Sequence, residues 1–274
     1  MPRPISLLAM IFWSSCGPAP APAPVVANVA SEPTARSGVV VDTSGPLGVL
    51  ALPAAAARRD DGPYWTAITT DAAAVVPAPA PLVPGQTYIA LPAGGEPAVE
   101  LTAGEPRSIA YGCEDNHTDM VPLDGAAVPA GLVWVLPRPV PAGWTPAARP
   151  LRLDLDSAGQ RRWSAGDLEI NLTRIDDQHA EFRIQVGAAT VHDERVEAYF
   201  MEGATLKPLD LTDGATPGIP VPEAVFGFGP GGPLLVVVDR SGFEGVGFQT
   251  LFIGDRGPAR EIAALGLGVY YCAF

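Results

Sequence analysis

Short apolar runs recur along this chain and are separated by Gly, Pro, Asp and Asn at intervals of roughly 8 to 12 residues. This spacing is typical of β-sandwiches and β-barrels. In the first half it predicts strands at residues 39–41, 47–52, 64–70, 87–91, 98–101, 108–111 and 132–136. We therefore expect an all-β fold, a sandwich or a barrel, with little helix.

The second half of the chain alternates apolar and polar residues more regularly. Leu151, Leu153 and Leu155 are separated by charged residues, and residues 168–172 alternate in the same way. Such strands place one face on a core and the other in water. The continuous apolar run 234–239 instead predicts a central strand that is buried on both faces. Further strands are expected at residues 180–186, 190–200, 246–253 and 268–274.

Three segments depart from the strand pattern. Residues 54–59 favour one helical turn and residues 259–265 a short helix. Residues 77–84 are rich in proline, which cannot donate to a strand ladder, so we expect a loop that crosses a sheet edge.

Prolines between Pro137 and Pro150 form the clearest internal break. We place a first β domain at residues 37–141 and a second at residues 150–274. Residues 132–138 and 234–240 share an apolar run that ends in Arg, which two related domains would explain. Chance similarity among the many Val and Leu runs explains it as well.

The first residues have the pattern of an export signal. Arg3 is followed by an apolar run at residues 5–13, much shorter than the roughly 20 residues that span a bilayer. Trp13-Ser14-Ser15-Cys16 resembles the lipobox of bacterial lipoprotein signals. The resemblance implies that residues 1–15 are a cleaved signal peptide and that the sulfur of Cys16 is diacylated. The alternatives are cleavage nearby by an ordinary signal peptidase and an apolar tail that is not cleaved.

The residues after Cys16 are expected to form a tether at positions 16–36. Residues 18–24 alternate Pro and Ala, which favours an extended polyproline II stalk of roughly 20 Å. Gly17, where an Asp would retain enterobacterial lipoproteins in the inner membrane, implies by the same resemblance a bacterial cell-envelope location at the outer membrane.

The net charge limits the classes of partner that this protein can bind. A formal charge of −13 argues against nucleic acid or an anionic membrane surface, because both attract positive proteins. Contact with a membrane would therefore go through the lipid anchor, and the remaining partner would be a protein or a carbohydrate. No cofactor is expected.

The three cysteines suggest one crosslink. If Cys16 carries the lipid, Cys113 and Cys272 remain as a candidate disulfide in an oxidising envelope. Two buried, unpaired cysteines are the alternative.

The densest group of potential metal ligands follows Cys113. Glu114, Asp115, His117 and Asp119 could hold zinc or manganese, because imidazole and carboxylate suit both ions. A solvated loop anchored by the disulfide is the simpler interpretation of the same residues.

The sequence assigns no catalytic residue. It has no nucleophile motif, and the Gly-x-Gly-x-x-Gly match at residues 227–232 precedes a predicted strand instead of a helix, so it is not a dinucleotide site. Glu194 with Glu197, or Asp239 with Glu244, could act in glycoside chemistry only if the fold sets their separation.

Four tryptophans could stack on sugars: Trp65, Trp134, Trp144 and Trp163. We expect Trp134 to be buried and Trp144 to be partly exposed. The sequence as a whole favours an envelope protein with a binding or structural role. A hydrolase or metal-binding protein centred on residues 114–119 is the alternative.

Overall fold

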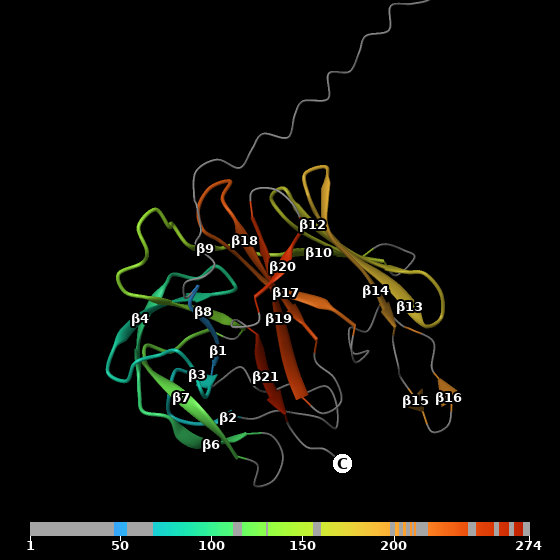
Figure 1. The fold of residues 1–274 in the computed structure, drawn as a ribbon. Helices are drawn as coiled ribbons and strands as arrows, with labels where there is room; N and C mark the ends of the chain where they lie inside the picture. Colours follow the sequence, from blue (N-terminus) through green and yellow to red (C-terminus); the bar gives the residue numbers. More distant parts are fainter. Residues whose placement is uncertain are drawn as a thin grey trace, which may run out of the picture. The chain divides into compact units, whose positions relative to one another are not determined.

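The computed structural model describes residues 47–53, 68–111, 117–129, 131–155, 160–197, 201–202, 205–206, 209, 211, 219–240, 245–254, 258–262 and 266–270. All of them belong to one compact unit, Pro33–Phe274. Strands and their connections make up the whole of this described part, and it contains no helix (Figure 1). The all-β prediction is confirmed.

The first half folds into a closed barrel. Its strands are β1 (Val49–Pro53), β2 (Ile68–Thr69), β3 (Ala74–Pro77), β4 (Thr87–Pro92), β5 (Val99–Ala103), β6 (Arg107–Tyr111), β7 (His117–Gly125) and β8 (Val133–Pro137). They pair in the order β2-β6-β7-β3-β1-β8-β4-β5, and β5 returns to pair with β7. That last pairing closes a ring of six antiparallel strands, β7-β3-β1-β8-β4-β5, and β6 and β2 extend the sheet from β7 outside this ring.

On one side, strand β7 pairs with two different strands in succession, and a proline lies where the partner changes. Its first half pairs with β6 at Met120, and its second half pairs with β5 at Leu123. Pro122 lies between them, where it pairs only with Val75 of β3 and accepts a hydrogen bond from the Gly104 amide at 2.8 Å. Because proline has no N–H to donate, this point between two neighbours is one that it can occupy inside a sheet.

The second half forms two sheets. The first is a meander of β10 (Arg152–Leu155), β11 (Arg161–Ala165), β12 (Leu168–Arg174), β13 (His179–Val186) and β14 (Ala189–Glu197), paired in chain order. The second has the order β20-β19-β18-β17-β9, with β21 on β19. Its strands are β9 (Ala147–Ala148), β17 (Val221–Gly227), β18 (Leu234–Asp239), β19 (Gly245–Ile253), β20 (Arg260–Glu261) and β21 (Leu267–Tyr270). A two-stranded hairpin, β15 (Met201–Glu202) and β16 (Thr205–Leu206), stands apart from both sheets.

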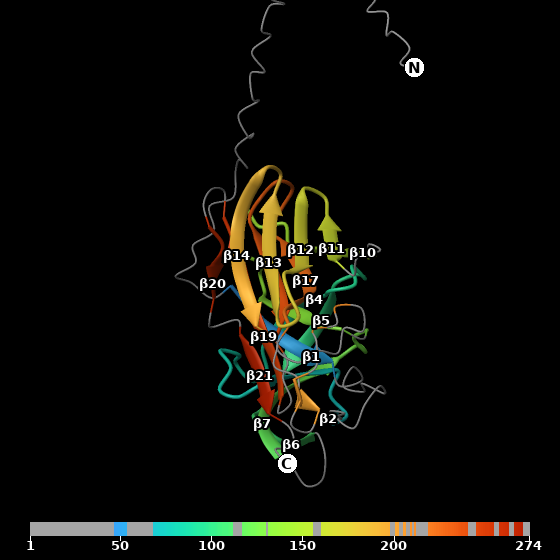
Figure 2. The same cartoon turned by 90° about the vertical axis from the view of Figure 1, so that its right-hand side faces the viewer.

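Strand β18 is the centre of the fold, and each of its residues is buried. Val236 and Val238 pack into the core beneath the five-stranded sheet, whereas Leu235 and Val237 pack toward Trp134 on the barrel. The six-stranded sheet is therefore a middle layer with a core on each side. Figure 1 shows its strands between the barrel and the five-stranded sheet, and Figure 2 gives the view at right angles. This confirms the prediction of a central strand buried on both faces.

The barrel and the later strands share one of these cores. Trp134 is fully buried, lies 5.1 Å from Phe228 between ring centroids, and donates its indole N–H to the Leu47 carbonyl at 2.7 Å. Gly48, at φ +90°, makes this approach possible, because a Cβ there would lie 2.3 Å from the Val135 oxygen. The predicted domains 37–141 and 150–274 thus meet through a common hydrophobic cluster. Their division into two domains stays a prediction.

The structure corrects several local predictions. Arg260–Glu261 pair with β19 as a strand, so the helix expected at residues 259–265 is wrong there. Strands β3 and β7 were not predicted, and Pro77, expected in a loop, ends β3. Residues 39–41 and 54–59, and most of the predicted strand at 64–70, lie outside the described residues.

Candidate functional site

Among the described residues, a connected group of polar side chains lies where the five-stranded and six-stranded sheets meet. We call it the Arg240 cluster, and it comprises His192, Glu194, Arg240, Gln249 and Glu261.

Strand β14 supplies the first two members. Glu194 pairs with Phe182 of β13, and His192 pairs with Ile184. Directly paired residues share a face of the sheet, and both β13 residues are fully buried. The register therefore turns His192 and Glu194 toward the core side, although the rest of this strand carries its charges outward.

Arg240 follows the end of β18 and reaches across to the other sheet. Its guanidinium holds Glu194 through two bonds, with Nη2–Oε2 at 2.5 Å and Nη1–Oε1 at 3.2 Å. Its own backbone amide donates to the Gly247 carbonyl at 2.6 Å. Only about a fifth of the Arg240 side chain is exposed, so this forked pair is shielded from water.

Strand β19 extends the network toward β20. The side-chain oxygen of Gln249 accepts from Nε of Arg240 at 3.1 Å and from Nη2 at 2.9 Å. Its amide nitrogen donates to Glu261 at 2.8 Å. The orientation of the Gln249 amide is therefore fixed, with its oxygen toward the cation and its nitrogen toward the carboxylate.

Aromatic contacts complete the cluster. The Arg240 guanidinium carbon lies 5.6 Å from the centre of the Phe182 ring, and His192 meets the same ring in an edge-on contact at 5.9 Å. A guanidinium over a ring face gains further stabilisation where water is excluded.

The cluster keeps Glu194 ionised. Partial burial raises the pKa of this carboxyl, but the hydrogen bonds and charge of Arg240, with a smaller contribution from His192, outweigh burial and leave the pKa lowered. A general acid of a glycosidase needs a raised pKa instead. The arrangement favours a structural ion pair that links the two sheets over a role in proton transfer.

The predicted metal ligands fall on and before β7. His117 and Asp119 are both exposed and, being two residues apart on one strand, lie on the same face. Glu114 and Asp115 lie outside the described residues, as do Cys16, Cys113 and Cys272, so the metal site, the lipidation and the disulfide stay predictions. Within the described ranges, no group of three or more His, Cys, Asp and Glu side chains is placed to hold a metal ion.

The proposed carboxylate pairs are not brought together in the part of the chain that is described. Glu194 and Glu197 are three residues apart on β14, which places them on opposite faces of the sheet. Asp239 is buried at the end of β18, and its suggested partner Glu244 lies outside the described residues.

The tryptophans follow the expected burial. Trp134 is buried and Trp144 is half-buried, as predicted. Trp144 packs edge-on against Phe228 at 4.6 Å, and Trp163 is also buried. Trp65 lies outside the described residues. The glycines at residues 227–232 lead from β17 into β18, so the prediction that a strand follows this glycine-rich loop is confirmed.

Sequence reasoning missed the Arg240 cluster as a unit. Its signals were an Asp-Arg pair that ends a fully apolar strand and a His and a Glu at alternate positions of another strand. Only the register of β13 with β14 and the order of the sheets show that these residues meet.

The described residues contain no helix long and apolar enough to cross a membrane. Comparison with family models, with curated proteins and with solved structures finds no match.

Proposed function

We propose that this protein is an exported bacterial envelope protein, anchored by lipid at Cys16, in which the β unit has a binding or structural role. The observation that carries the proposal is the order of segments: a short basic and apolar start, a lipobox-like Trp13-Ser14-Ser15-Cys16, and a Pro-Ala stalk. They precede one compact β unit. A stalk of this kind holds a folded unit away from the surface that anchors it.

The Arg240 cluster supports a role without catalysis. Its carboxylate is held by a forked guanidinium and its pKa is lowered, which suits a rigid joint between two sheets. A rigid unit of this kind suits binding of a protein or carbohydrate partner on an outer surface.

Lipidation is tested by expressing the full chain in a bacterium and measuring the intact mass of the membrane-extracted product. We expect a mature chain that begins at Cys16 and carries acyl chains. The Cys16→Ser variant should lose the lipid and leave the detergent phase. A soluble wild-type product that begins elsewhere would refute lipidation, and a retained Met1 would refute export as well.

A metal-binding protein or hydrolase centred on residues 114–119 is the second candidate, since His117 and Asp119 present their side chains on one exposed face of β7. Metal analysis of the purified full chain tests it. Stoichiometric zinc, manganese or calcium that is lost in the His117→Ala variant would favour this candidate, and metal-free protein would exclude a tightly bound ion.

A further inference from the structure

Strand β10 is an edge strand that carries exposed leucines and charges of both signs. It ends the five-stranded sheet, and no other described strand pairs with its free side (Figure 2). The opposite edge strand, β14, does have a neighbour, because the Ala259 amide donates to the Val191 carbonyl at 2.5 Å. Within the described part of the chain, the backbone groups on the free side of β10 have no strand partner, and such groups readily template another strand.

Two leucines of this strand are exposed. Leu153 and Leu155 are 45% and 55% exposed, and they are among the few large apolar side chains of the described residues that face solvent. Leu153 pairs with Trp163, which is buried, so both leucines lie on the core face of the sheet. The apolar face of the sheet therefore extends to its edge strand, where these two leucines remain exposed to solvent.

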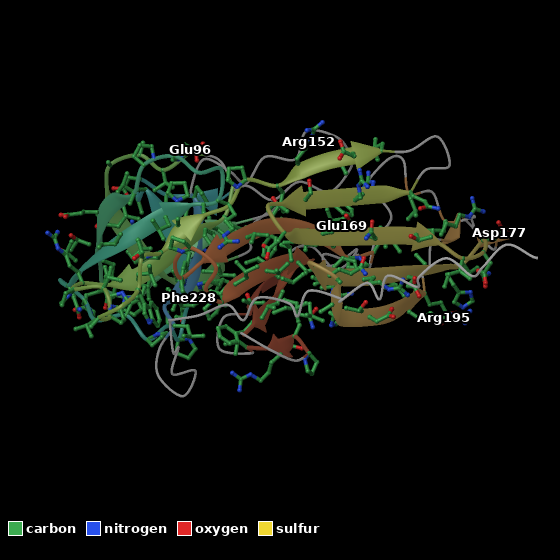
Figure 3. All side chains as sticks on the ribbon, turned by 90° about the horizontal axis from the view of Figure 1, so that it is seen from above. Glu96, Arg152, Glu169, Asp177, Arg195 and Phe228 are labelled. Atoms are coloured by element: carbon green, nitrogen blue, oxygen red, sulfur yellow. The ribbon has the colours of Figure 1, made fainter. Side chains whose placement is uncertain are left out.

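The other face of the strand carries one charge of each sign. Arg152 lies 3.4 Å from Asp154, between Nε and Oδ1, and Asp154 also lies 3.6 Å from Arg162. Figure 3 shows Arg152 at the free edge of this sheet. Proteins that only protect an edge usually place charges there that repel a second copy.

The order Arg-Leu-Asp is complementary to itself in one register. If two copies of β10 pair antiparallel about Leu153, then Leu153 faces Leu153 of the second copy, and Arg152 faces Asp154 in both directions. Opposite charges at directly paired positions stabilise a sheet, and like charges destabilise it. A register centred on Asp154 would place the two Asp154 carboxylates face to face, and parallel pairing in register would place Arg152 against itself.

We infer that β10 pairs with β10 of a second copy of this chain, joining two five-stranded sheets across a two-fold axis. The partner's strand satisfies the free backbone groups, its leucines cover Leu153 and Leu155, and its Arg152 supplies Asp154 with a second cation. A short strand pair buries less surface than the roughly 1,600 Å² of a stable interface, so the dimer is weak in dilute solution. Confinement on a membrane, under the proposed anchoring, would raise its population. The pairing itself does not depend on the lipid.

Disulfide trapping of the purified full chain tests this geometry. Paired Cα atoms in antiparallel strands lie about 4.5 to 5.5 Å apart, within reach of a disulfide. A Leu153→Cys variant should therefore form crosslinked dimers under mild oxidation at least about tenfold more than Val83→Cys, which alters an exposed apolar site elsewhere that is even more accessible. Both variants retain the native cysteines, so those contribute equally. Equal crosslinking would overturn the inference.

Charge variants in the Leu153→Cys background test the register. Arg152→Asp places like charges opposite each other and should lower crosslinking about tenfold, whereas Arg152→Asp with Asp154→Arg restores the complementarity and the crosslinking. Differently tagged Arg152→Asp and Asp154→Arg chains should crosslink to each other more than to themselves. Crosslinking yields that are the same in all of these charge variants would refute the proposed pairing. A failure of lipidation would not affect either result.

Discussion

Arg240 shows how much of the fold can depend on one side chain. It follows a strand in which each residue is buried, crosses to the neighbouring sheet and holds a carboxylate that partly faces the core. Removing a single partner of such a pair costs more than the pair contributes, because the remaining charge keeps its desolvation cost. Arg240 therefore offers the most informative single substitution in the described residues.

We predict that Arg240→Ala lowers the free energy of unfolding by about 2 kcal/mol, since it removes charge-assisted bonds and leaves Glu194 with only its 3.3 Å contact to His192 within the Arg240 cluster. Urea denaturation measures the change. The matched control is Arg195→Ala, on the outer face of β14, whose side chain is 61% exposed and lies 3.8 Å from Asp176. Surface pairs of that kind contribute less than about 1 kcal/mol. Equal losses in the two variants would contradict the assigned role of Arg240.

Glu194 gives the cluster a pH dependence of definite sign. Its pKa is lowered from the ordinary value of 4.5, so the folded state binds fewer protons than the unfolded state in the range just below that value. The stabilisation from the Arg240 pair is present above pH 4.5 and is lost as the pH falls through the pKa of the folded state.

We expect the stability difference between wild type and Glu194→Gln to shrink as the pH falls from about 5.5 toward 3. Urea midpoints measured at each pH provide the comparison. The difference isolates Glu194 from Asp71 and Asp176, whose lowered pKa values add to the acid sensitivity of both proteins. A constant difference down to pH 3 would show that Arg240 does not lower this pKa.

At the scale of elements, the sequence predicted a strand correctly where burial alone determines the pattern of apolar residues. The alternation at 168–172 and the apolar run at 234–239 predicted β12 and β18, because burial of one face or of both leaves a direct mark on the sequence. Strands β3 and β7 were missed for a different reason. Ala-rich residues and Pro122 argue locally against a strand, and barrel closure overrides them.

Strand β18 offers a test of the layered architecture. Val236 faces one core and Val237 faces the other. We predict that Val236→Ala and Val237→Ala each lower the free energy of unfolding by about 2 kcal/mol, because each leaves a cavity in a packed core. In β12, Ile170→Ala should be costly, whereas Asn171→Ala at the neighbouring, outward position should change stability by less than about 1 kcal/mol. A small effect at either valine would contradict the burial of both faces.

At the scale of the whole molecule, the two halves are held together by more than chain connectivity. The aromatic cluster around Trp134 joins the barrel to the middle sheet, and β21, the last strand described, also approaches β3 of the barrel. The sequence alone predicted such a return of the chain only through its cysteines, because a contact between distant segments leaves no local pattern. Which residues meet in the Arg240 cluster was unpredictable for the same reason.

The last prediction is that Cys113 and Cys272 form a disulfide. Cys113 comes two residues after the end of β6, and Cys272 comes two residues after the end of β21. The approach of β21 to β3 brings the last described strand to the barrel, which favours this pairing. The bond would close a loop of about 160 residues, for which the chain-entropy model gives a stabilisation of about 5 kcal/mol as an upper figure.

Thiol titration of the lipidated full chain, unfolded without reductant, measures the pairing directly. We expect no reactive thiol, because the Cys16 sulfur is acylated and the other two are joined, and two thiols after reduction. In the Cys113→Ser variant one thiol should appear, and stability should fall by a few kcal/mol, within the usual range for a native disulfide. Two reactive thiols per unreduced chain would show that the cysteines are free, and the two halves would then be held together by noncovalent contacts, among them the Trp134 cluster and the approach of β21 to β3.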